Sequence, residues 1–225
     1  MLDAGLAARH VPGVYLSPQT AILGFSQGGH AALWATQLAP AWTPGQPISG
    51  TVLAAPASEV VEYVQSGVSD PANAAAPVSV IAGLAAAYPE AQAAIGTVLT
   101  PAGQELLALM DEHCFDESVA TPPGALLAAD PLSVEPFASL IAAQTAGTGA
   151  APTPVLILHG DADMNVPLSL SDQLVTRLCA AGQVVERRVL PGQTHFIALT
   201  IASRDGIPWL DGLRAGTPAV NTCPA

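Results

Sequence analysis

The sequence predicts an α/β fold with a mostly parallel sheet and a helical insertion between the two parts of that sheet. Two observations lead to this prediction. Short apolar runs alternate with helix-forming segments at both ends of the chain, and this alternation is typical of parallel sheets. The middle of the chain has no convincing strand pattern and carries short apolar helical stretches separated by Pro and Gly. We therefore expect a core formed by residues 1–56 and 153–225, and a helical lid or cap formed by residues 57–152.

Four elements are expected before the insertion. They are the end of a helix at residues 2–9, a strand at 20–24, a helix from His30 to about Leu38 that is ended by Pro40, Pro44 and Pro47, and a second strand at 48–55. Within the insertion, helical stretches are expected at residues 60–64, 78–88, 104–113 and 133–143. After a linker at 147–154, the pattern predicts a strand at 155–158, a helix at 168–181, a strand at 184–190, and a loop at 191–196 that opens a further helix.

Composition narrows the range of partners. The 225 residues suffice for one domain with a sizeable core, and 50% of them are apolar. The net charge of −12 argues against nucleic acid and anionic membrane surfaces as partners. The longest apolar stretch, residues 77–88, is too short to span a membrane. Residues 1–10 lack the apolar region of a signal peptide.

Three cysteines, Cys114, Cys179 and Cys223, allow one disulfide bond and leave one thiol over. Cys179 lies near the end of a predicted helix and Cys223 near the C-terminus, so a disulfide between them is one possibility. Three reduced, buried thiols are the other. Because there is no Cys-x-x-Cys motif and no His/Cys cluster, we expect neither a metal nor another cofactor.

The motif that carries the chemistry is Gly-Phe-Ser-Gln-Gly at residues 24–28, between a predicted strand and a predicted helix. A serine at such a sharp turn takes a strained backbone conformation, and Gly24 and Gly28 would let the chain pass close by. The strain exposes the hydroxyl, and the helix N-terminus points its N–H groups toward a developing oxyanion. Ser26 is therefore a candidate nucleophile. The alternative is an ordinary loop serine between two glycines.

A serine nucleophile needs a histidine base, and the histidine needs a carboxylate that fixes its tautomer. Ser26, Asp163 and His195 occur in the chain order of α/β-hydrolase triads, each after a predicted strand. Asp161 competes with Asp163 as the acid, but Asp163 lies further along its loop and is favoured. The other histidines are interpreted as surface residues (His10 and His113), as a satisfied core group (His159), or as a residue that packs near the site without reacting (His30).

With these motifs the chain resembles the secretory lipases, the lipase A-like α/β-hydrolases. The matching segments are Gly-Phe-Ser-Gln-Gly-Gly-His-Ala-Ala at 24–32, Pro-Val-Leu-Ile-Leu-His-Gly-Asp-Ala-Asp at 154–163, Arg-Leu-Cys-Ala-Ala-Gly at 177–182, and Pro-Gly-Gln-Thr-His at 191–195. The resemblance implies a secreted serine hydrolase of carboxylic esters, including lipids, with a helical lid before the acid. It carries over Ser26 as nucleophile, Asp163 as acid, His195 as base, and the backbone N–H of Gln27 as one oxyanion donor.

The start of the chain departs from that pattern. An α/β-hydrolase places several strands before its elbow, and one of their loops supplies the second oxyanion donor. Only 25 residues precede Ser26 here, so we expect a reduced α/β-hydrolase fold without that donor. Ser17, Thr20, His30 or a neighbouring subunit could replace it. The strand at residues 20–24 would then end the sheet, and we expect either a dimer or a segment 1–18 that folds back over this edge.

Three functions stay open from the sequence. The first is a serine ester hydrolase acting through an acyl-enzyme. The second is a catalytically weak or inactive hydrolase-like module that kept the elbow but lost the oxyanion hole. The third is another reaction on the same triad, such as thioester cleavage, as in the acyl-protein thioesterases that share the elbow sequence, or acyl transfer or peptide cleavage.

Overall fold

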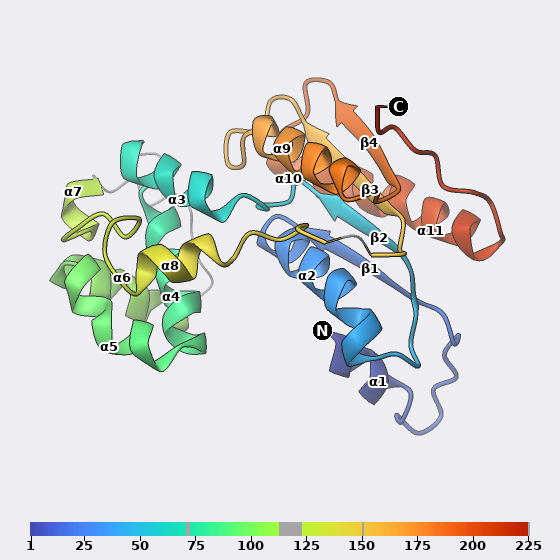
Figure 1. Ribbon diagram of the computed structural model, residues 1–225, viewed down its shortest axis with the longest axis horizontal. Helices are drawn as coiled ribbons and strands as arrows, with labels where there is room; N and C mark the ends of the chain where they lie inside the picture. The colour runs from blue at the N-terminus through green and yellow to red at the C-terminus, as the bar shows by residue number, and fades with distance from the viewer. Residues whose placement is uncertain (71–72, 113–122, 150, 225) are drawn as a thin grey trace. The chain divides into compact units, whose positions relative to one another are not determined.

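The computed structural model describes residues 1–70, 73–112, 123–149 and 151–224, which form two compact units. The first unit comprises Met1–Ser58 and Ala146–Ala225, and the second comprises Glu59–Thr145. Figure 1 shows the four strands in the first unit and the helices α3 to α8 in the second. Every residue with a predicted catalytic role belongs to the first unit.

The first unit is built on a parallel four-stranded sheet in the order β1-β2-β3-β4. The strands are β1 (Thr20–Phe25), β2 (Ile48–Ala54), β3 (Val155–Gly160) and β4 (Val185–Leu190). The helices are α1 (Leu2–Ala8), α2 (Gln27–Trp42), α9 (Leu168–Ala180), α10 (His195–Ile201) and α11 (Ile207–Arg214), with a short π-helix, η2 (Ala202–Gly206), between the last two. A parallel sheet with helices confirms the predicted α/β class.

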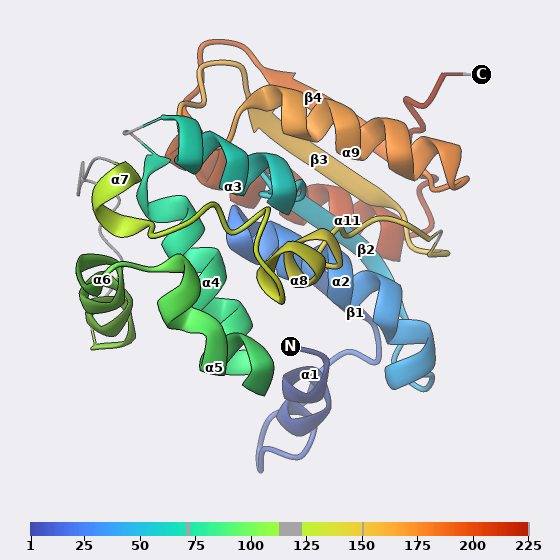
Figure 2. The ribbon, with the colours of Figure 1, turned by 60° about the vertical axis from the view of Figure 1, so that its left-hand side comes forward.

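Alternate residues of the strands face two separate cores, one on each side of the sheet. In β2, Leu53 packs with buried residues of α2 and α9, while its neighbours Val52 and Ala54 pack with η2 and α11. The same alternation occurs in β3, where Ile157 faces the first core and Leu156 the second. Figure 2 shows α2 and α9 on one face of the sheet and α11 on the other. Because both faces are covered, the central strands β2 and β3 are buried along nearly their whole length, whereas the edge strand β4 carries Glu186, Arg187 and Arg188.

The helix after the elbow is longer than predicted. It begins at Gln27, directly after Ser26, and continues past Pro40 to Trp42. The prediction that Pro40 ends the helix was wrong. A proline lacks its own N–H donor and crowds the carbonyl four residues before it, but the residues after it keep their donors. Thr43 N–H still donates to Ala39 O at 2.9 Å, which closes the helix beyond the proline.

The second unit consists of helices packed around a core of its own. They are α3 (Val60–Ser69), α4 (Ala75–Ala87), α5 (Pro89–Val98), α6 (Pro101–Glu112), α7 (Pro123–Leu126) and α8 (Phe137–Ala142). Buried side chains such as Ile81, Phe137 and Ile141 fill the centre. Helix α5 was not predicted, although Pro89 at its first turn is a typical helix start. His113, the expected end of one helical stretch, and Cys114 lie outside the described residues.

The two edges of the sheet differ. At β4 the C-terminal tail runs alongside, since Thr222 N–H donates to Val185 O at 2.8 Å and Arg187 N–H donates to Thr222 Oγ1 at 3.0 Å. A disulfide bond between Cys179 in α9 and Cys223 holds this tail in place. Of the two possibilities left by the sequence, the structure therefore has the disulfide.

Replacing Cys223 by serine should destabilise the first unit, because the disulfide closes a loop of 44 residues and fixes the tail along β4. Loss of a native disulfide typically costs about 2–5 kcal/mol. Chemical denaturation of the wild type and of Cys223→Ser measures the difference. The matched control is Thr217→Ser in the segment before the tail, which should unfold like the wild type. An unchanged denaturation midpoint for Cys223→Ser would contradict the stabilising role.

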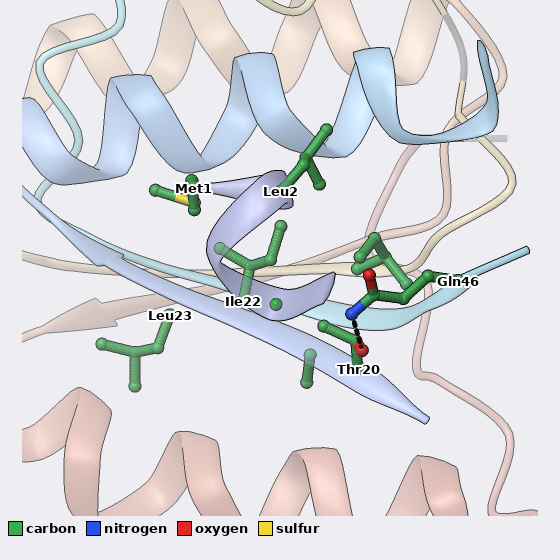
Figure 3. A pocket seen from close by; sticks show the side chains of 9 residues that line it. Met1, Leu2, Thr20, Ile22, Leu23 and Gln46 are labelled. Atoms are coloured by element: carbon green, nitrogen blue, oxygen red, sulfur yellow. Dashed lines mark hydrogen bonds between the residues drawn. The ribbon is translucent and has the colours of Figure 1, made fainter. Parts of the chain in front are cut away.

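At the other edge, β1 is the outermost strand. Helix α1 lies beside the first half of β1. Its Asp3 accepts a hydrogen bond from Nε1 of Trp42, the last residue of α2, at 2.9 Å, and Leu2 packs onto the first core. A hollow of about 270 Å³ lies between this segment and the strand. Figure 3 shows the side chains that line it, among them the apolar Leu2 and Ile22 and the polar Thr20 and Gln46. The segment thus folds back beside β1 but does not fill the space against it.

Within the described ranges, no helix is both long enough and apolar enough to cross a membrane.

Candidate active site

Ser26 lies at the turn between β1 and α2, where the sequence placed the elbow. Its backbone has φ 53° and ψ −123°, a conformation that non-glycine residues rarely adopt. The surrounding chain holds it there. Ser26 N–H donates to Ala54 O at 2.9 Å, and Ser26 O accepts from the N–H groups of Gly29 at 2.9 Å and Ala57 at 3.1 Å. Strain of this kind persists where its surroundings over-determine it, and it is concentrated at functional sites.

The two glycines of the elbow have different roles. A Cβ on Gly24 would lie 2.2 Å from Gly28 O and 2.7 Å from Ala32 Cβ, so the start of α2 passes directly over this residue. A Cβ on Gly28 would meet nothing within 4 Å. The expectation that both glycines are needed for close passage was therefore wrong for Gly28, which contributes its backbone oxygen, not its missing side chain.

This difference gives a matched pair of variants. We expect Gly24→Ala to lower the stability of the first unit by at least about 1–3 kcal/mol, the usual range for overpacking, because helix α2 must move. Gly28→Ala should unfold like the wild type. Thermal unfolding followed by circular dichroism compares the two. Equal melting temperatures for the variants would mean that the elbow tolerates a side chain at residue 24.

The acid and base loops approach each other closely after β3 and β4. A Cβ on Gly160 would lie 2.0 Å from Gln193 O, so only glycine fits at the end of β3. Ala162 N–H donates to the same Gln193 O at 3.1 Å. This backbone contact joins the loop that carries Asp163 to the loop that precedes His195, the first residue of α10.

Asp163, and not Asp161, lies against His195. Asp163 Oδ2 is 2.6 Å from His195 Nδ1, and the carboxylate and the imidazole are both buried. Asp161 instead accepts the N–H of Gly192 at 2.6 Å and shapes the loop before the histidine. With Nδ1 engaged by a carboxylate, Nε2 is the ring nitrogen of His195 that is left to take a proton from a nucleophile.

Asp163 is held as a carboxylate. Burial by itself would raise its pKa, but hydrogen bonds from His159 and His195 and the backbone N–H of Val166 outweigh burial and hold the pKa well below the usual range of an aspartate. The carboxylate is therefore ionised at neutral pH. An ionised partner stabilises the imidazolium that forms when His195 accepts a proton.

The imidazole of His195 lies beside the elbow. Its ring centroid is 4.7 Å from that of Phe25, the residue directly before Ser26, and 5.5 Å from that of Phe196. The structure thus brings the three predicted residues to the same end of the sheet: Ser26 follows β1, Asp163 follows β3 and His195 follows β4. This end is where parallel sheets carry their sites.

The N-terminus of α2 is placed to donate hydrogen bonds to an oxyanion, since Gln27 is the first residue of the helix and its N–H has no acceptor within the helix.

Ser17 and Thr20, which the sequence suggested as second oxyanion donors, are not placed for that role. Thr20 begins β1, roughly 16 Å of strand away from Phe25 at the other end. Its hydroxyl accepts hydrogen bonds from Gln46 Nε2 and Arg9. Ser17 precedes it and accepts the N–H of Gln19.

Sequence reasoning missed one contact of the site. The interpretation of His159 as a satisfied core group is confirmed, since it is buried with both ring nitrogens bonded, but the contact of its Nε2 with Asp163 Oδ2 at 3.1 Å was not predicted. The short spacing of His159 and Asp163 in the sequence could have indicated this contact, because the two residues are four positions apart around the turn that ends β3.

Across the described ranges, no group of three or more His, Cys, Asp or Glu side chains is placed to hold a metal ion.

The chain is similar to known lipases in sequence. Residues 2–222 match the family model described as secretory lipase. A curated relative, a secreted triacylglycerol lipase of Malassezia globosa, is 26% identical over 194 residues, which are 80% of this chain and 41% of the relative. The chain therefore spans about two fifths of the length of that protein.

Solved structures share the fold. Candida antarctica lipase A in its closed state superposes with a TM-score of 0.79 at 21% identity, covering 92% of this chain and 52% of the lipase. A rice cell wall degrading esterase of Xanthomonas oryzae superposes with a TM-score of 0.72 at 13% identity, covering 96% of this chain and 64% of the esterase. At these identities the likeness establishes an α/β-hydrolase fold.

Proposed function

This chain belongs to the secretory lipase family, and we propose that it hydrolyses carboxylic esters by a serine mechanism centred on Ser26. The match confirms the family that the sequence resembles, and family and curated relative both agree with secretion. The observation that carries the proposal is the buried hydrogen bond of 2.6 Å between Asp163 and His195, beside a serine with φ 53°.

In the proposed mechanism, Ser26 Oγ attacks the ester carbonyl carbon while His195 Nε2 takes the hydroxyl proton. Asp163 keeps the hydrogen of His195 on Nδ1, so that Nε2 is free to act as a base. The tetrahedral intermediate collapses, the ester C–O bond breaks, and His195 gives the proton to the leaving alcohol. A water molecule, deprotonated by His195, then attacks the acyl-enzyme, releases the carboxylic acid and restores Ser26.

The N–H of Gln27, at the positive end of the α2 dipole, is the proposed donor to the oxyanion. A second donor is needed for full activity, since the loss of one typically costs about 10²–10³ in kcat. His30 is a candidate by its place one turn into α2, where its Nε2 accepts a hydrogen bond from Trp34 Nε1 at 3.1 Å. A neighbouring subunit is another candidate.

The surface around the triad suits an apolar acyl group. Met164, next to the acid, is 83% exposed, and Phe196, next to the base, is 63% exposed. Apolar side chains that stay open to solvent beside a polar site are typical of a surface that binds apolar ligands. We therefore propose a lipid-like ester as substrate, and we propose that the helical unit Glu59–Thr145 acts as its lid.

Hydrolysis of p-nitrophenyl esters of graded chain length tests the proposed function. We expect release of nitrophenol by the wild type, with kcat/KM rising from the acetate to longer acyl chains as more apolar surface is buried. Absence of turnover with every ester would favour the inactive-module alternative. Faster reaction with acyl thioesters than with the matching oxygen esters would favour thioesterase activity.

We also propose that the outer edge of β1 pairs with the same edge of a second copy. In support, β1 ends the sheet, Ala21 is exposed on it, and apolar residues such as Val14 and Leu16 are exposed in the segment that leads to it. An apolar edge strand favours pairing with another chain, and a two-fold dimer is the simplest closed solution.

Light scattering after size-exclusion chromatography at low micromolar concentration should give twice the chain mass of 22.6 kDa. Ala21→Lys should shift the protein toward monomer, since a charged side chain on an edge strand opposes pairing. The control is Ala31→Lys, on the exposed side of α2. A wild-type monomer would rule out the dimer, and loss of the dimer in both variants would place its interface elsewhere.

A further inference from the structure

The remaining buried histidine of the first unit, His159, lies in the centre of a polar cluster. It is the fifth residue of β3 and only 1% exposed. Its two ring nitrogens contact three groups: Nε2 lies 2.9 Å from Val166 O and 3.1 Å from Asp163 Oδ2, and Nδ1 lies 2.5 Å from Ser171 Oγ. Ser171, in α9, is fully buried.

These contacts define where the hydrogen of His159 lies. A carbonyl oxygen and an ionised carboxylate can only accept, so Nε2 carries the hydrogen and donates to both Val166 O and Asp163 Oδ2. In the neutral ring Nδ1 is then an acceptor, and the hydroxyl of Ser171 donates to it. Val166 O and Asp163 Oδ2 thus select the tautomer of His159, and the hydroxyl of Ser171 completes the bonding of the ring in that tautomer.

As a result, Asp163 accepts four hydrogen bonds. Oδ1 accepts the N–H groups of Asn165 at 2.9 Å and Val166 at 2.8 Å, and Oδ2 accepts from His195 and His159. A carboxylate has about four lone-pair sites, so the four donors occupy every acceptor site of Asp163. Its plane cannot turn without breaking at least one of these bonds in a buried site, where an unmade bond is costly.

We propose that His159, held by Ser171, is a positioning residue that sets the direction and the basicity of Asp163 Oδ2 toward His195. This proposal rests on the proposed ester hydrolysis at Ser26. Direction matters because His195 binds through the same oxygen. Basicity matters because a second donor on that oxygen withdraws negative charge from it, and so moderates its attraction for the imidazolium of His195.

Three variants separate this role from simple filling of the core. His159→Leu fills the space without a donor, and we expect kcat/KM to fall about 100-fold, the size expected when a catalytic group is displaced by about 1 Å. His159→Gln keeps an N–H near the position of Nε2 and should recover most of the activity. Ser171→Ala keeps His159 but removes the hydroxyl that bonds its Nδ1. It should give an intermediate loss of kcat/KM.

The pH profile of kcat/KM also tests the proposal. If His159 only filled the core, its replacement would not change the pH midpoint of that profile. The titratable groups that face His195 are Asp163 directly and His159 through Asp163. Without the donor of His159, Oδ2 holds the imidazolium more strongly, so the midpoint of the rise in kcat/KM should move to higher pH in His159→Leu. It should stay near the wild-type value in His159→Gln. Equal losses in these two variants, with unmoved midpoints, would overturn the proposal.

A spectroscopic measurement does not depend on turnover. In the full chain labelled with ¹⁵N-histidine, we expect His159 to carry its hydrogen on Nε2, and the proton between His195 and Asp163 to shift in His159→Leu but not in His159→Gln. If the Nε2 hydrogen of His159 and the shift in His159→Leu are both observed but the wild type cleaves no ester, the proposed function fails and the positioning role stands. If His159 carries its hydrogen on Nδ1, or if the proton is unmoved in His159→Leu, the positioning role fails whatever the activity. Should His159→Leu not fold, His159→Gln and Ser171→Ala are still compared with the wild type.

Discussion

Replacing Ser26 by alanine should remove essentially all ester hydrolysis, with kcat falling about 10⁶-fold, as for loss of the nucleophile in other serine hydrolases. Alanine lacks the oxygen that forms the acyl-enzyme, but it has the same Cβ as serine. It therefore fits the conformation with φ 53° as well as serine does, and the elbow keeps its shape. Hydrolysis of p-nitrophenyl esters and labelling by a fluorophosphonate probe both measure the loss.

The matched control is Ser203→Ala, an exposed serine in η2 whose hydroxyl donates to Leu199 O in the adjoining helix α10. It should react with probe and ester like the wild type. Mass spectrometry of the labelled wild type should find one probe per chain, attached to the peptide that contains Ser26. Turnover by Ser26→Ala, or a probe on another residue, would overturn the role of Ser26.

Replacing Asp163 by asparagine should lower kcat about 10⁴-fold, the size seen when the acid of a Ser-His-Asp triad becomes an amide. Oδ1 faces two backbone N–H groups, so the amide turns its oxygen toward them and its NH₂ toward His195. Nδ1 of His195 must then accept, the ring hydrogen moves to Nε2, and Nε2 can no longer take the proton of Ser26. Steady-state kinetics at pH 7 with a short-chain ester measures the loss.

Asp161→Asn is the control for this variant. The amide keeps an oxygen for the N–H of Gly192, and the carboxylate bonded to His195 Nδ1 is that of Asp163. Activity should stay close to that of the wild type. A large loss in Asp161→Asn together with an active Asp163→Asn would reverse the assignment of the acid.

The sequence alone determined the local features of this protein. The alternation of apolar strands and helices predicts a parallel sheet, and the structure has one. The position of the turn at Ser26 follows from residues within a few positions of it, because a strand, a glycine and a helix start are adjacent in the chain, whereas Ala54 and Ala57 hold its backbone from another segment. The helical character of the insertion follows in the same way from its own composition.

Tertiary structure decided what depends on residues far apart in the chain. The sequence favoured Asp163 over Asp161 by its place on the loop, but the contact of Asp163 with His195 depends on the path of two loops, joined where Gln193 passes over Gly160. The need for glycine at residue 24 but not at 28 depends on how α2 crosses β1. The link from Ser171 through His159 to Asp163 exists because α9 packs beside the end of β3. A sequence lists these groups, but only packing defines the distances between them, and hydrogen bonds depend on distances of a few tenths of an ångström.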